Sequence, residues 1–210
     1  NLIFLKMKRF IVIAILLFTV SLSAQEVRFG VKGGVNFSKI NINQSNDLLN
    51  SEMKTGFHIG GLVEFKLTNR FALEPQLFYS RQNSILEIKL ADLTFPGSTP
   101  NDPIFVENIN NEYNLDLINL PILAKFYITE GFNIFAGPQF SYLVSEKDKY
   151  DIKEFDYGLI GGLGYQFDSG LLLSANYYLG MNDINNFIEP IQNQLKLKQR
   201  VIQFSVGYLF

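Results

Sequence analysis

The sequence predicts an all-β protein in which eight antiparallel strands form one up-and-down barrel. Three observations carry this prediction. Apolar residues alternate with polar or small residues over eight separate stretches of the 210-residue chain, which is the period-two pattern of strands with one apolar face. The connections between these stretches alternate between short and long. Beyond the N-terminal region, no apolar run approaches the roughly 20 residues that a membrane-spanning helix needs.

The alternation is clear in the first stretch, where Val27, Phe29 and Val31 alternate with Arg28 and Lys32. One face of this strand is therefore apolar and the other is polar. The same pattern recurs seven times. An even number of strands allows an up-and-down chain to close with every neighbour antiparallel. The eight predicted strands are residues 27–37, 55–67, 71–81, 118–128, 132–144, 155–167, 171–180 and 198–210.

Short and long connections alternate along the chain, so the tight turns are expected at one end of the barrel and the long loops at the other. Within the longest loop, Leu86, Ile88 and Leu90 alternate with charged residues, which indicates that the third strand continues past the barrel. The tight turns are residues 68–70, 129–131 and 168–170, and the long loops are residues 38–54, 82–114, 145–154 and 181–197.

The spacing of the aromatic residues favours a transmembrane barrel over a soluble one. In five strands, two aromatic residues lie eight positions apart on the apolar face. Eight tilted strand residues rise roughly 20 Å along a barrel axis, close to the height of the apolar band that aromatic girdles flank. A soluble core gives no reason for this repeat. The pairs are Phe29 and Phe37, Phe57 and Phe65, Phe71 and Tyr79, Phe132 and Phe140, and Tyr157 and Tyr165.

The N-terminal region is typical of a signal peptide. Lys6, Lys8 and Arg9 precede the apolar residues 10–20, and small residues follow to Ala24. We expect cleavage after Ala24 and translation from Met7, with residues 1–6 as an upstream extension. An uncleaved membrane anchor is the alternative. The predicted organisation is therefore a signal peptide, residues 1–24, and one barrel domain, residues 25–210.

The composition excludes several classes of function. The net charge is −2, so no basic surface suggests binding to nucleic acid. The chain contains no cysteine, which excludes disulfides, thiolate metal sites, a thiol nucleophile and lipoprotein anchoring.

Four segments resemble the PorT-like outer-membrane β-barrel family. They are residues 155–165 (FDYGLIGGLGY), 177–184 (YYLGMNDI), 117–123 (LINLPIL, with Asn119 where glutamate is usual) and 30–36 (GVKGGVN). The resemblance covers nearly the whole chain after the signal peptide. It implies an eight-stranded barrel in the outer membrane. Because the family's named member is tied to protein export, it also implies an alternative role as an accessory component of an export machine.

The final strand adds support for an outer-membrane location. Ile202, Phe204, Val206, Tyr208 and Phe210 alternate up to the last residue given. This pattern is similar to the C-terminal signal that barrel-insertion machinery reads, so we expect that machinery to be a partner of this strand.

His58 is the one histidine in the sequence, and alternation places it inside the barrel. Some small outer-membrane barrels are lipid-modifying enzymes that use histidine with serine, and such a base needs a nucleophile within hydrogen-bond reach. Ser80, Ser141 and Ser174 also point inward, but a site for lipid should face the bilayer or the rim. A histidine in a polar network inside the barrel is the favoured interpretation.

Two other patterns superficially suggest binding sites. A glycine-rich phosphate loop must open a helix, whereas these glycines lie within a predicted strand and are expected to make room in a narrow barrel. The acidic residues of the third long loop lack the order of a calcium loop and are expected to be solvated. The glycines are Gly158, Gly161, Gly162 and Gly164, and the acidic residues are Glu146, Asp148, Asp151, Glu154 and Asp156.

Four charged residues are predicted to close the barrel near its tight turns. Alternation places Arg28, Glu64, Glu74 and Lys125 inside, at similar depth on the first four strands. Eight strands enclose a space that side chains alone can fill. We therefore expect the two positive and two negative groups to pair and to leave no open pore; a hydrated mouth in which they barely interact is the alternative.

Together these patterns predict a non-enzymatic outer-membrane barrel with a structural or surface-interaction role. No catalytic, cofactor-binding or metal-binding residue is assigned. The expected partners are outer-membrane lipid and lipopolysaccharide, the insertion machinery, and an envelope protein bound through residues 82–114, the part of the chain least like a barrel.

Overall fold

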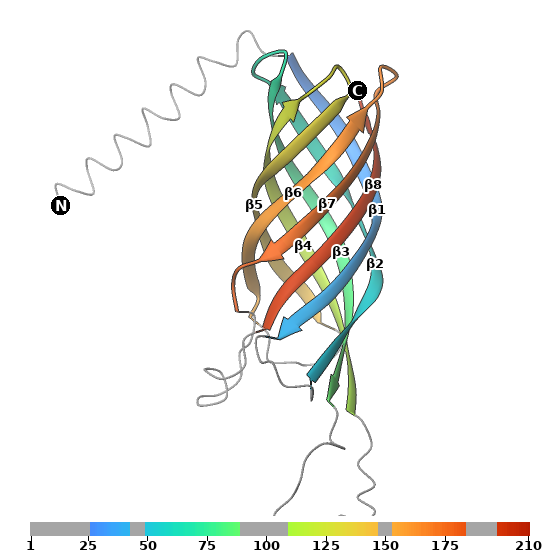
Figure 1. Cartoon of the computed structure of the whole chain (residues 1–210), viewed down its shortest axis with the longest axis vertical. Helices are drawn as coiled ribbons and strands as arrows, with labels where there is room; N and C mark the ends of the chain where they lie inside the picture. The colour runs from blue at the N-terminus through green and yellow to red at the C-terminus, as the bar shows by residue number, and fades with distance from the viewer. Residues whose placement is uncertain (1–25, 43–48, 89–108, 147–152, 184–196) are drawn as a thin grey trace, which may run out of the picture.

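The computed structural model describes residues 26–42, 49–88, 109–146, 153–183 and 197–210. Within these residues, eight strands follow one another around a closed barrel, and the last strand pairs with the first (Figure 1). Every pair of neighbours is antiparallel, which confirms the predicted fold. The strands are β1 (Glu26–Ile42), β2 (Leu49–Lys66), β3 (Phe71–Ile88), β4 (Ile109–Tyr127), β5 (Phe132–Glu146), β6 (Phe155–Gln166), β7 (Leu171–Gly180) and β8 (Leu197–Leu209).

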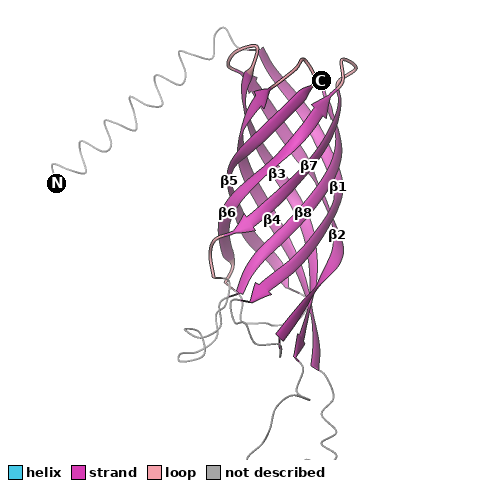
Figure 2. Cartoon of the chain, viewed as in Figure 1, coloured by secondary structure: helices cyan, strands magenta, loops and turns pink. Residues whose placement is uncertain are grey.

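The three tight turns lie together at one end of the barrel, which we call the turn end, and the C-terminus lies there too (Figure 2). The opposite end, where the long connections lie, is called the loop end. Among the described residues, no helix has the length and apolar character that crossing a membrane would require. The predicted signal peptide, residues 1–24, lies outside the described residues, so cleavage after Ala24 stays a prediction.

The strands near the loop end are longer than predicted. β3 and β4 stay in register from the barrel to the pair Ile88 and Ile109, so much of the predicted loop 82–114 is a hairpin. β1 and β2 likewise extend into the predicted loop 38–54. The continuation of β3 past residue 81 agrees with the alternation of Leu86 and Ile88, whereas the extensions of β1, β2 and β4 were not predicted.

The two faces of the wall differ in chemistry as predicted. The outer face is apolar, with exposed residues such as Phe29 and Ile59. Aromatic contacts lie on this face near both ends: Phe71 packs on Phe126 at the turn end, and Phe140 packs on Phe155 near the loop end. The inner face carries buried polar side chains together with a small apolar cluster around Tyr178. The buried polar groups are where the candidate site lies.

Candidate functional site

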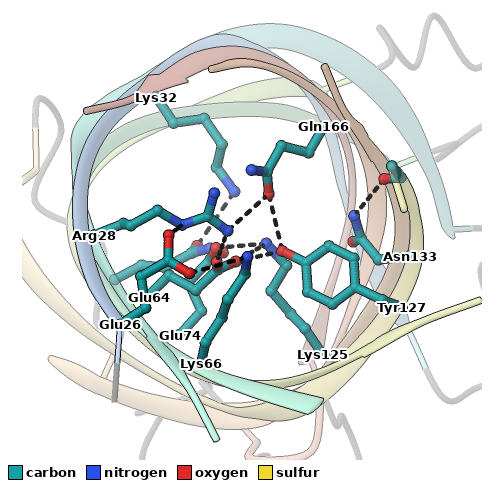
Figure 3. Close-up of polar contacts among 12 residues, drawn as sticks. Glu26, Arg28, Lys32, Glu64, Lys66, Glu74, Lys125, Tyr127, Asn133 and Gln166 are labelled. Atoms are coloured by element: carbon teal, nitrogen blue, oxygen red, sulfur yellow. Dashed lines mark hydrogen bonds and ion pairs between the residues drawn. The ribbon is translucent and has the colours of Figure 1, made fainter. Parts of the chain in front are cut away.

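A charged cluster fills the lumen near the turn end, and we call it the plug. Its centre is the carboxylate of Glu64, which is fully buried and accepts a hydrogen bond from Lys125 Nζ at 2.7 Å. The same ammonium group binds the Glu74 carboxylate at 2.7 Å. Arg28, which pairs with Glu64 across β1 and β2, forms a second ion pair with it. Figure 3 shows these side chains crossing the lumen. The structure thus brings together all four charged residues that the sequence predicted.

Two members of the plug were missed by sequence reasoning. The hydroxyl of Tyr127 donates to Glu64 at 2.6 Å. The amide of Gln166 lies 2.9 Å from that hydroxyl, and with its nitrogen facing Tyr127 its oxygen accepts from Arg28. Tyr127 follows Lys125 by two positions and therefore points inward as well, so the alternation could have predicted its place in the plug. Gln166 lies on β6, and its place beside Arg28 depends on how the barrel closes, which alternation does not specify.

A further buried cation, Lys32, lies next to the plug. Its side chain is 7 % exposed and its ammonium group donates to Gln76 Oε1 at 3.4 Å, while Gln76 donates to Glu74 at 2.5 Å. The ammonium group also lies 5.2 Å from the centre of the Phe78 ring, a distance at which a cation is attracted to an aromatic face. Lys32 therefore joins the plug through Gln76 rather than through a carboxylate of its own.

Side chains leave little space in this part of the lumen. Two interior cavities that adjoin Lys32 have volumes of about 20 Å³ and 10 Å³. Each is about the size of one water molecule. Ion pairs bridge β1, β2, β3 and β4 across the lumen at the same level. The arrangement is that of a filled barrel, in which buried charges are compensated by partners rather than by bulk water.

His58 lies among polar side chains inside the barrel, the arrangement that the sequence favoured over a catalytic one. Its Nε2 atom lies 2.8 Å from the hydroxyl of Ser205, a serine that the sequence analysis did not consider. Ser80 lies opposite His58 in the register but binds Asn36. The other ring nitrogen of His58 has no hydrogen-bond partner within the described part of the chain, so no carboxylate there orients the ring as a general base would need. The pair is buried in the lumen, away from the lipid-facing surface.

Two of the four strand glycines, Gly158 and Gly162, make room for a neighbouring strand as predicted, whereas Gly161 has ordinary clearance. An added Cβ atom at Gly158 or Gly162 would lie 2.2 Å or 2.3 Å from a backbone oxygen of β7, so β6 and β7 approach too closely for side chains there. No helix begins at this segment, and a phosphate loop is thereby excluded.

The prediction for the acidic loop was wrong for Asp156. This residue begins β6 with its side chain buried and accepts a hydrogen bond from the Tyr178 hydroxyl at 2.9 Å. The error arose because residues near a loop were assumed to be solvated, although alternation from Gly158 places Asp156 inside. Glu154 is exposed, as expected, whereas residues 147–152 lie outside the described residues. Among the described residues, no group of three or more histidine or acidic side chains could hold a metal ion.

At the loop end, β2, β3 and β4 project beyond the other strands (Figure 1). β1 pairs with β2 only as far as Lys54, although β2 begins at Leu49. β5 pairs with β4 only from Leu115, although β4 begins at Ile109. Residues 49–53 and 109–114 are therefore edges of a three-stranded extension, and within the described residues neither has a strand partner on its outer side.

One ion pair lies at the base of this extension. The guanidinium group of Arg81 on β3 makes two hydrogen bonds to the Asp116 carboxylate on β4, at 2.7 Å and 2.9 Å. It also lies 5.9 Å from the centre of the Phe57 ring on β2. These contacts link the three strands where they leave the barrel, which favours a fixed orientation of the extension.

Comparison with known proteins gives a consistent result for the fold. The family model described as "Outer membrane protein beta-barrel domain" matches residues 23–186. The solved structure of Neisserial surface protein A is 13 % identical, with a TM-score of 0.52 over 87 % of this chain and 97 % of that chain. No curated protein sequence matches the chain. At this identity the structural likeness shows the fold alone.

Two further solved structures are similar over most of their length. OprG from Pseudomonas aeruginosa is 13 % identical, covering 89 % of this chain and 97 % of that chain, with a TM-score of 0.48. Ail of Yersinia pestis, solved with the heparin analogue sucrose octasulfate, is 11 % identical, covering 88 % and 99 %, with a TM-score of 0.47. These matches do not distinguish the PorT-like branch, which stays a prediction.

Proposed function

This chain belongs to the outer membrane protein beta-barrel domain family. We propose that it is a non-enzymatic barrel, that its lumen is closed, and that its three-stranded extension lies outside the cell. The protein lies in the cell outer membrane. In barrels of this kind the tight turns face the periplasm and the long connections face the outside. The extension of β2, β3 and β4 at the loop end then lies on the cell surface.

The plug is the observation that carries this proposal. A pore needs a continuous aqueous path, whereas in this barrel three ion pairs centred on Glu64 and Lys125 cross the lumen at one level. Separating them would leave buried charges without partners, at a cost of several kcal/mol. The plug is therefore expected to stay closed under ordinary conditions.

Planar-bilayer recording tests the closed lumen. Purified, refolded protein is expected to give no steady unitary conductance, because the plug blocks the lumen. The control is a variant that removes the plug's pairs and bulk together, with Arg28, Glu64, Glu74 and Lys125 all replaced by serine. If this variant folds, any conductance that it gains measures the share of the block due to the plug, because the apolar cluster around Tyr178 still fills the lumen beyond it. Reproducible channels from the unaltered protein would refute the proposal.

An enzymatic role is disfavoured by the surroundings of His58. The His58–Ser205 pair is enclosed by other lumen side chains and has no orienting carboxylate among the described residues. A lipid substrate would need to reach this pair from the bilayer, but the barrel wall separates the two. The surface extension is thus the part of the molecule best placed for a role outside the barrel.

The surface extension offers backbone hydrogen-bonding groups to a partner. Within the described residues, the outer edges at residues 49–53 and 109–114 have no strand partner for their N–H and C=O groups. Extended segments of other proteins bind such edges by adding a strand. Neither edge contains proline or lysine, residues that commonly block such pairing. This supports the partner predicted for residues 82–114 and extends its site to β2.

Shortening the extension tests this role. Residues 85–112 would be replaced by Asn-Gly, a sequence that favours a tight hairpin turn, so that Ser84 and Tyr113 remain paired. Proteins captured with the full-length protein by cross-linking on intact cells should be lost from this variant. A matched variant with residues 147–152 replaced by the same dipeptide should retain them. An identical set of partners in both variants would contradict the proposal, and capture of export-complex subunits would favour the alternative accessory role.

A further inference from the structure

The outer ends of β1 and β8 carry three basic side chains on one face of the wall. Lys39 lies opposite Arg200 in the register, and Lys198 lies opposite Asn41. Their neighbours Ser38, Ile40, Gln199 and Val201 are buried, so Lys39, Lys198 and Arg200 point away from the lumen. We call these three residues the rim cluster.

The rim cluster lies just outside the membrane's apolar band. Phe37 lies on the outer wall eight positions from Phe29, the spacing of residues that flank the apolar band at its two interfaces. It packs edge to face against Phe204, which lies nearer the middle of the wall. Lys39 follows Phe37 by two positions towards the loop end, and Arg200 pairs with Lys39. The three cations therefore occupy the level of the lipid headgroups, on the side that faces out of the cell.

This arrangement concentrates positive charge that the described part of the protein does not neutralise. Like charges directly opposite one another across two strands destabilise a sheet, yet Lys39 and Arg200 are such a pair. Among the described residues, no carboxylate lies within 4 Å of any of the three. Arg200 uses Nη1 to donate to the backbone oxygens of Gly180 and Gln199, at 2.8 Å and 2.7 Å. Its remaining N–H groups stay available to an anion.

Another arginine at the same end shows the contrast. The guanidinium group of Arg81 is held by both oxygens of Asp116, so its charge is compensated within the protein. Arg200 attracts the carboxylate of Asp156, but that carboxylate is buried in the lumen, bonded to Tyr178, and forms no ion pair with Arg200. The rim cluster thus lacks the local partner that Arg81 has.

We propose that the rim cluster binds a phosphate group of the phosphorylated glycolipid in the outer leaflet. A phosphate accepts charge-assisted hydrogen bonds from arginine and lysine. Its negative charge would offset the repulsion between Lys39 and Arg200. The acyl chains of the same lipid would lie against the apolar wall below, where Phe204 is exposed and Phe37 is half-buried. The cluster would therefore hold one glycolipid in a fixed place beside the seam between β8 and β1.

Native mass spectrometry of the refolded full chain in neutral detergent tests this site. The probes are bisphosphorylated lipid A, chemically dephosphorylated lipid A, and phosphatidylglycerol. We expect bisphosphorylated lipid A to bind best. Replacing Lys39, Lys198 and Arg200 together by glutamine should weaken its binding at least about tenfold, because several charge-assisted hydrogen bonds are lost. Binding of dephosphorylated lipid A should be weaker and should not change in this variant.

The matched control is Lys66→Gln with Arg70→Gln, which removes two cations from the turn end. This variant should bind bisphosphorylated lipid A like the unaltered protein. Heat-modifiable migration in gels checks that each variant is folded, and single replacements serve if the triple variant is not. Unchanged affinity in the folded variants, or binding that does not depend on phosphate, would overturn the proposal. Equal binding of phosphatidylglycerol would overturn the assignment to the glycolipid.

Discussion

Replacing Glu64 by alanine is expected to lower the free energy of unfolding by roughly 3–5 kcal/mol, the usual effect of removing one partner of a buried ion pair. Glu64 is fully buried and holds Arg28, Lys125 and Tyr127. Without it, Arg28 loses its closest carboxylate and Lys125 retains only Glu74. Unfolding by urea in lipid vesicles, followed by heat-modifiable gel migration, measures the change.

The control for Glu64 is Glu130→Ala, which removes an exposed carboxylate from a tight turn at the same end of the barrel. Surface changes of this kind usually alter stability by less than about 0.5 kcal/mol. Glu64→Gln separates charge from shape, and it should still destabilise the protein because the neutral amide cannot balance two cations. If Glu64→Ala were no more harmful than Glu130→Ala, the plug would be a solvated rim.

Replacing Gly34 by valine is expected to prevent closure of the barrel. Gly34 lies on β1 where this strand pairs with β8. A Cβ atom there would lie 1.9 Å from the backbone oxygen of Phe204 and 2.8 Å from Cα of Ser205, and backbone atoms have little freedom to move away. The folded fraction after refolding, measured by heat-modifiable migration, should fall to a small part of that of the unaltered protein.

Gly61→Val provides the comparison for this experiment. Gly61 is also a strand glycine, on β2, but a Cβ atom there would approach only the backbone oxygen of Gly30, at 3.8 Å. Because that is an ordinary van der Waals distance, the barrel should fold as before. Loss of folding in both variants would show that strand glycine itself, rather than close approach at the β1–β8 seam, is required.

The predictions that succeeded depend on two regularities of strands. Period-two alternation determines which face of a strand a side chain occupies, and the distance from a tight turn determines its depth. Together they place Arg28, Glu64, Glu74 and Lys125 in one cluster. The ion pairs of the plug could therefore be predicted from the sequence, whereas Tyr127 and Gln166 were missed.

The features that were missed depend on how strands are staggered around the barrel. His58 reaches Ser205 because Gly34, which faces both of them in the register, has no side chain to separate them. No local pattern specifies the stagger between the first and last strands. The continuation of β3 was predicted, but the matching extensions of β2 and β4 were not. The stagger at which β1 meets β8, and the distance by which strands project at the loop end, are therefore known from the three-dimensional structure alone.

The pairing of β1 with β8 also determines the order in which the barrel can be completed. Every other strand pair joins two strands that are consecutive in the sequence. The β1–β8 pair instead joins the two ends of the barrel domain, with Gly30 opposite Leu209 and Ile42 opposite Leu197. It can form only when the last strand is in place, so a barrel in lipid that lacks β8 has two open edges that lipid cannot satisfy. All the charged groups that pair in the plug come from β1 to β4. The first half of the chain therefore contains everything needed to neutralise these charges, and the second half can close over a plug that is already assembled.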